Sequence, residues 1–107
     1  VAEEYKKRAL EKRLEFSSRD YVLSYESLRD SYAVLLESWT NLKDESKATD
    51  TMARGERAKW QQGGSDLYFV NLREEDVAEV EIKKWSTIVE LAQTDIDLRL
   101  LEVSLVP

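Results

Sequence analysis

Two adjacent glycines, Gly63 and Gly64, separate two long charged runs in a chain that otherwise contains one further glycine and one proline. Glycine adopts positive φ without a Cβ penalty, and a residue in that conformation often ends a helix. Ser65 and Asp66 follow, and either side-chain oxygen can cap the N–H groups of a new helix. The stretch therefore predicts a first helix over about 3–61, a turn at 62–65 and a second helix over about 66–104.

The composition agrees with a helical hairpin that has a narrow buried seam. With 42% apolar and 36% charged residues, the 107-residue chain has too few apolar residues for a deep core and too many for a disordered segment. We therefore expect an all-α fold in which residues 1–107 form one long antiparallel coiled-coil hairpin. Because the chain begins with Val1, we also expect it to be a fragment of a larger protein.

Several function classes are disfavoured by residues that the chain lacks. It has no cysteine and no histidine, which removes thiolate chemistry, the commonest metal ligand and the usual general base. The carboxylate groupings Asp66 with Glu74 and Glu79 with Glu81 have no nucleophile or phosphate loop beside them, so we expect no enzyme and no cofactor. A net charge of −6 with interspersed signs argues against nucleic-acid binding, and no apolar run is long enough to span a membrane.

The first helix carries a row of apolar residues in which steps of four and three alternate, as in a coiled-coil seam. The row consists of Tyr21, Tyr25, Leu28, Tyr32, Leu35, Trp39 and Leu42. Cofactor stacking by the aromatic rings is the less favoured alternative. From 43 to 58 the seam positions are small or polar, so either the helix breaks near Thr49 or it continues. We favour continuity, since no proline intervenes and Gly55 costs only about 1 kcal/mol inside a helix.

The second helix carries two apolar rows. The first row, which we expect to form its seam, contains Ala78, Ile82, Trp85, Val89, Ala92 and Ile96, and the second contains Val77, Ile88, Leu91 and Leu98. The first helix likewise has apolar residues off its seam, at Val22, Val34 and Leu36. Helices that are apolar on two flanks are expected where each has a neighbour on both sides, as in a ring or sheet of helices, although a bundle fits nearly as well. We therefore expect self-association as a dimer or higher oligomer. A capping box at Asn71 and Glu74 would delay the helix start by a turn.

The two predicted helices differ in length. At 1.5 Å per residue the first would extend roughly 85–90 Å and the second roughly 55 Å. The second can then cover only the half of the first that lies nearest the turn. Four apolar residues would lie beyond its reach, namely Tyr5, Leu10, Leu14 and Phe16.

The residues around the turn resemble a known family. The stretch Gly63-Gly-Ser-Asp-Leu-Tyr-Phe-Val-Asn-Leu-Arg-Glu74, followed by Ala78, Glu79 and Glu81, is similar to the tip of TolC-like outer-membrane efflux proteins. Trp60, Gly63, Val70 and Asn71 fall on the family's tip pattern, and Arg73-Glu74 matches the Asn-x-Arg-Glu form of one branch. The resemblance is specific over about fifteen residues, and elsewhere only the helical period supports it.

This resemblance implies a periplasmic entrance hairpin of a bacterial outer-membrane channel for efflux or type I secretion. It implies a trimeric parent whose hairpin tip docks a membrane-fusion adaptor. The adaptor-facing residues would be Trp60, Gly63, Gly64, Ser65 and Leu67. The chain departs from some members by having Phe69 and Leu72 in place of entrance aspartates and Ser65 in place of a basic residue. The alternative is a structural coiled-coil hairpin without a transport role, in which the glycines only make the turn.

Overall fold

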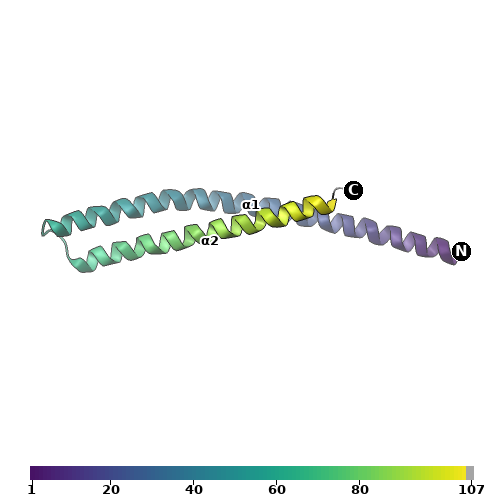
Figure 1. Cartoon of the computed structure of the whole chain (residues 1–107), viewed down its shortest axis with the longest axis horizontal. Helices are drawn as coiled ribbons and strands as arrows, with labels where there is room; N and C mark the ends of the chain where they lie inside the picture. The colour runs from purple at the N-terminus through teal and green to yellow at the C-terminus, as the bar shows by residue number, and fades with distance from the viewer. Residues whose placement is uncertain (106–107) are drawn as a thin grey trace. The chain divides into compact units, whose positions relative to one another are not determined.

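The computed structural model describes residues 1–105, which form two helices, α1 (Ala2–Gln61) and α2 (Leu67–Leu105), joined by a turn at 62–66 (Figure 1). The prediction of an all-α helical hairpin is confirmed. Helix α1 runs unbroken past Thr49, so the alternative with a break there is wrong. Helix α2 begins at Leu67, one residue after the predicted start, and Pro107 lies outside the described residues.

The polar stretch of α1 stays helical because its hydroxyl groups bond to the helix itself. The Thr49 hydroxyl donates to the Glu45 carbonyl oxygen at 3.0 Å, and Thr51 donates to the Lys47 carbonyl oxygen at 2.9 Å. These bonds satisfy the side chains without breaking the backbone ladder. The ends of α1 also suit the helix dipole, with two glutamates in its first turn and Lys59 in its last.

The structure divides into two compact units. Unit 2 comprises Val34–Ala92, with the turn and the adjoining parts of both helices, which run side by side (Figure 1). In unit 2 the α1 seam continues the predicted row through half-buried or buried side chains as far as Glu56. These are Leu35, Trp39, Leu42, Ser46, Thr49, Ala53 and Glu56. The predicted α1 seam is therefore found at the expected positions, and small polar residues extend it toward the turn.

The α2 side of this seam is not the row that we expected to form it, although two of its members, Val77 and Leu91, belong to the second predicted row. Its members are at least partly buried and again alternate in steps of three and four, namely Val70, Arg73, Val77, Val80, Lys84, Thr87 and Leu91. Val70 is fully buried and Val80 is 4% exposed. The row that we expected to form the seam is exposed instead. The side chains of Ile82, Trp85 and Val89 are 66%, 61% and 67% exposed. One face of α2 in unit 2 is therefore an uncovered apolar stripe, which we call the α2 stripe (Ile82, Trp85, Val89).

Trp39 is a half-buried member of the unit 2 seam. The ammonium group of Lys43, one turn along α1, lies 3.9 Å from the centre of the Trp39 ring, a cation–π contact. The indole Nε1 is buried and has no hydrogen-bond partner among the described residues. The side chain is thus held by ring contacts rather than by its polar atom.

Unit 1 comprises Val1–Ala33 together with the chain from Gln93 onward. Tyr25, Leu28 and Tyr32 are half-buried there, whereas Tyr21 and Ile96 of the predicted rows are exposed. The Tyr25 hydroxyl donates to Glu102 Oε1 at 3.0 Å, and this bond raises the pKa of Tyr25. The four residues expected to lie beyond the reach of α2 are exposed, as predicted: Tyr5, Leu10, Leu14 and Phe16.

Candidate docking site at the hairpin tip

Helix α1 ends at two glycines whose backbone N–H groups are both hydrogen-bonded to the last turn of the helix. Gly63 has a φ of 79°, its N–H donates to the Trp60 carbonyl oxygen at 3.0 Å, and the Gly64 N–H donates to the Lys59 carbonyl oxygen at 2.8 Å. These two bonds are the pair that defines a Schellman motif, with Gly63 in the left-handed position. The role predicted for the double glycine is therefore present in the structure.

The start of α2 is capped by Asp66. Its Oδ1 accepts a hydrogen bond from the Tyr68 N–H at 3.2 Å, which satisfies one of the donors at the helix start. Ser65, the other candidate cap, instead donates from its hydroxyl to Glu56 Oε1 at 2.9 Å and ties the turn to α1. The capping box at Asn71 and Glu74 is not used, because the helix has already begun at Leu67.

The two glycines differ in what a side chain would meet. A Cβ on Gly63 would find nothing within 4 Å, and one on Gly64 would lie 3.6 Å from the Lys59 carbonyl oxygen, an ordinary contact. Glycine is therefore required at Gly63 for its backbone conformation rather than for lack of space. Open space beside Gly63 also leaves the turn backbone accessible to another molecule.

Five large apolar side chains flank this turn and remain exposed. This tip patch consists of Trp60 (39%), Leu67 (47%), Tyr68 (65%), Phe69 (50%) and Leu72 (41%). The Tyr68 and Phe69 rings meet edge to face with their centres 5.5 Å apart. Sequence reasoning selected Trp60 and Leu67 but missed the docking potential of the other three. Their place in the first two turns after the predicted cap at Asp66 was the available signal.

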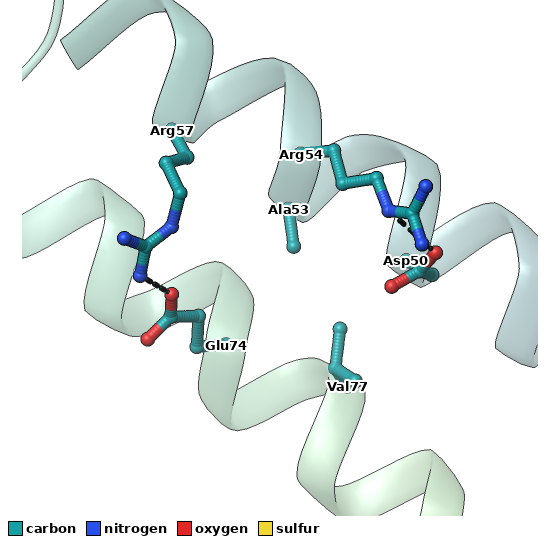
Figure 2. Close-up of a pocket in the computed structure, with 6 residues that line it drawn as sticks. All are labelled: Asp50, Ala53, Arg54, Arg57, Glu74 and Val77. Carbon is teal, nitrogen blue, oxygen red and sulfur yellow. Dashed lines mark hydrogen bonds and ion pairs between the residues drawn. The ribbon is translucent and has the colours of Figure 1, made fainter. Parts of the chain in front are cut away.

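Below the tip, the two helices enclose a small hollow (Figure 2). Its lining residues are Asp50, Ala53, Arg54, Arg57, Glu74 and Val77. The Arg57 guanidinium pairs with the Glu74 carboxylate across the two helices, whereas Arg54 Nε pairs with Asp50 Oδ2 at 3.0 Å within α1. Each positive charge thus has its own carboxylate, and the hollow carries no excess charge.

A second polar contact crosses the seam farther from the turn. The Ser46 hydroxyl donates to Glu81 Oε1 at 2.7 Å, and Lys84 Nζ lies 2.9 Å from the same oxygen. The hydrogen bond from Ser46, followed by that from Lys84, holds the pKa of Glu81 below its ordinary value of 4.5. Both contacts favour the ionised carboxylate, and the one from Ser46, which joins α2 to α1, is strongest while Glu81 is charged.

This contact predicts an acid-dependent loss of stability. Because the folded-state pKa of Glu81 is depressed, its contribution is present above pH 4.5 and disappears as the pH falls below that value. Glu81→Gln should therefore be less stable than wild type at pH 7, and the gap should shrink as the pH falls below 4.5. Urea unfolding followed by circular dichroism at several pH values measures this, with Glu79→Gln as the exposed control. An equal loss for Glu81→Gln at all pH values would contradict the assignment.

Three of the four carboxylates considered for catalysis have structural partners here. Asp66 caps α2, Glu74 pairs with Arg57 and Glu81 accepts from Ser46. Within residues 1–105, no group of three or more potential ligands is placed to hold a metal ion. No helix in the same range has both the length and the apolar character to cross a membrane. Comparison with family models, with curated proteins and with solved structures yields no significant match.

Proposed function

We propose that this chain is the periplasmic entrance hairpin of a TolC-like outer-membrane channel for efflux or type I secretion. In this proposal the hairpin tip docks a membrane-fusion adaptor protein, and the parent channel is a trimer. The observation that carries the proposal is the tip patch, five exposed apolar side chains arranged around a fully bonded turn. The resemblance of Gly63–Glu74 to the family's tip supplies the identity of the partner.

The physical case for docking rests on exposure and rigidity together. Leaving apolar surface in water forgoes about 25 cal/mol for each Å² that a partner could bury. Aromatic anchors such as Tyr68 and Trp60 are the residue types that dominate binding energy at protein interfaces. Because the Schellman bonds and the Asp66 cap already order the turn, a partner would lose little affinity to ordering it.

The α2 stripe supports the assembly part of the proposal. A helix that is apolar on two faces needs a neighbour on each, and α1 occupies only one of them in unit 2. In a channel built from several hairpins, helices of adjacent hairpins would cover the second face. Placement in the periplasm follows from the resemblance and from the adaptor partner, and it is part of the proposal.

The alternative is a structural coiled-coil hairpin, and one observation favours it. Open space around Gly63 shows that its φ alone explains the glycine, so the turn needs no docking partner. The full-length gene separates the two proposals. A signal peptide and a second hairpin repeat are expected for the channel, whereas a scaffold requires neither.

The docking proposal predicts the effect of removing two rings from the tip patch. In the full-length protein, Tyr68→Ser with Phe69→Ser should weaken adaptor binding by at least about tenfold, since truncating an aromatic anchor typically costs more than 1 kcal/mol. Both residues are exposed, so the hairpin should keep its helicity. Affinity for the purified adaptor and growth on a panel of toxic compounds are the measurements.

The matched control for this experiment is Tyr5→Ser. Tyr5 is 78% exposed and belongs to unit 1, so its loss should change neither adaptor affinity nor tolerance. If the tip variant bound the adaptor as well as the wild-type protein does, this result would contradict the proposed docking role of the tip patch. Helicity by circular dichroism should be the same for all three proteins.

A further inference from the structure

Packing between the helices is interrupted just below the tip. On α2, Val70 is fully buried and Val80 is 4% exposed, but Val77, between them in the row, is only half-buried. Across from it stands Ala53, whose short side chain leaves the hollow of Figure 2 between the two helices. The seam is therefore thinner at this level than at Val70 and Val80, although Ala53 itself is buried.

One ion pair bridges the helices at this point. Both Arg57 and Arg54 line the hollow, but their partners differ in a way that Figure 2 makes visible. Arg57 reaches across to Glu74 on α2, whereas Arg54 folds back to Asp50 one turn earlier on its own helix. Only the first pair can hold α1 and α2 together.

We propose that the Arg57–Glu74 pair is a clasp for the tip, defined here as residues 54–76 with the turn between them. While the pair is closed, it holds the tip helices together across the hollow. When it opens, the helix segments that border the hollow loosen locally, while the buried Val70 nearer the turn and the larger side chains of Leu35, Trp39 and Leu42 farther from it keep the rest of unit 2 paired. The clasp is a conformational device independent of the proposed channel role, since it follows from the hairpin alone.

The exposure of the clasp makes it reversible. The Arg57 and Glu74 side chains are 50% and 45% exposed, so water and dissolved ions screen their attraction. A pair of this kind shifts a local equilibrium by about twofold to fivefold rather than locking it. High salt, or a partner that offers a competing carboxylate to Arg57, would therefore be enough to open it.

Hydrogen exchange of backbone amides, read by mass spectrometry on the complete chain, tests the clasp. Arg57→Gln and Glu74→Gln should each raise exchange in peptides from 54–61 and 67–76 by about twofold to fivefold, with 34–45 unchanged. Arg54→Gln is the matched control, because it removes a charge from the same hollow without touching a bond between helices. It should leave the tip peptides as in wild type.

Two further measurements make the outcome decisive. The charge swap Arg57→Glu with Glu74→Arg should restore wild-type exchange, and 1 M salt should raise wild-type exchange to the level of Arg57→Gln, as the Debye length is then about 3 Å. Equal effects of Arg54→Gln and Arg57→Gln would overturn the clasp. So would exchange that rises equally in 34–45, or a charge swap that exchanges as fast as the single variants. None of these readouts involves an adaptor or transport, so failure of the clasp leaves the proposed function untouched.

Discussion

Replacing Gly63 with alanine is expected to lower the free energy of unfolding by about 1–2 kcal/mol, the penalty of holding a Cβ in the left-handed conformation. The φ of 79° at this residue is the only positive value among the described residues. Because nothing lies within 4 Å of the added Cβ, the loss should come from the backbone alone. Urea unfolding followed by far-ultraviolet circular dichroism, which reports helix content, gives the measurement.

The other two glycines are the controls for this prediction. Gly55 lies inside α1 with nothing within 4 Å of its Cβ position, so Gly55→Ala should raise the free energy of unfolding by about 1 kcal/mol. Gly64→Ala should have a small effect, since its Cβ would make an ordinary contact of 3.6 Å with the Lys59 carbonyl oxygen. The same sign of change at Gly63 and Gly55 would contradict the assigned helix stop.

The same position connects stability with the proposed function. Proline at Gly63 cannot adopt positive φ and has no N–H to donate to the Trp60 carbonyl oxygen, so it should disrupt the turn. In the full-length protein we expect Gly63→Pro to impair transport and adaptor binding while assembly is retained. Bulky residues at Gly63 or Gly64 should act in the same direction.

The second large effect is expected at the α2 stripe. If the chain self-associates through this stripe, as we propose, Trp85→Glu should make it monomeric, because it places a charge in the middle of the exposed row of Ile82, Trp85 and Val89. Burying a charge against another helix without a partner is unfavourable by several kcal/mol, whereas an exposed glutamate is tolerated in a helix. Sedimentation equilibrium measures the mass, and circular dichroism checks that helicity is retained.

Val34→Glu is the matched control for the stripe. Val34 is 66% exposed, close to the 61% of Trp85, but it lies on α1 and does not belong to the α2 stripe. Because Val34 is one of the off-seam apolar residues of α1, this variant separates the two exposed faces: if the α2 stripe is the contact, Val34→Glu should leave the association state unchanged. A wild-type chain that is already monomeric would remove the association prediction, and an equal response of both variants would show that the stripe is not the contact.

Most of α1 and the turn could be predicted because the sequence there offers one continuous row of apolar residues with helical spacing, together with clear local signals for the turn. The row from Tyr25 to Leu42 is the only one on that stretch with continuous four-three spacing, and it is the row that packs. Gly63 and Asp66 carry local signals that act without tertiary contacts, a left-handed stop and a side-chain cap. The continuity of α1 followed from the absence of proline between the helix ends.

The register of α2 could not be predicted in the same way, because that helix has two rows with the same spacing. The more apolar row, with Ile82, Trp85 and Val89, is exposed. The row that packs against α1 includes Arg73, Lys84 and Thr87. It is therefore less apolar than the exposed row, and counting apolar residues would not select it. Polar contacts from α1, such as Ser46 to Glu81, accompany this register, and they become visible only when the two helices are placed together.

The tip was predicted only in part for a related reason. Trp60 and Leu67 were selected because they match a family pattern, but Tyr68, Phe69 and Leu72 could equally have been core residues of the new helix. Their exposure depends on Val70 being the buried position of that turn. One fully buried valine thus decides which of its neighbours face water.

The placement of the three tryptophans gives the chain a separate optical reporter for each of its surfaces. Trp39 sits in the seam beneath Lys43, Trp60 belongs to the tip patch, and Trp85 lies in the α2 stripe. Indole emission shifts to shorter wavelength when the ring leaves water. Chains that retain a single tryptophan can therefore distinguish unfolding, the proposed adaptor binding and the proposed oligomer formation by fluorescence, without an attached dye.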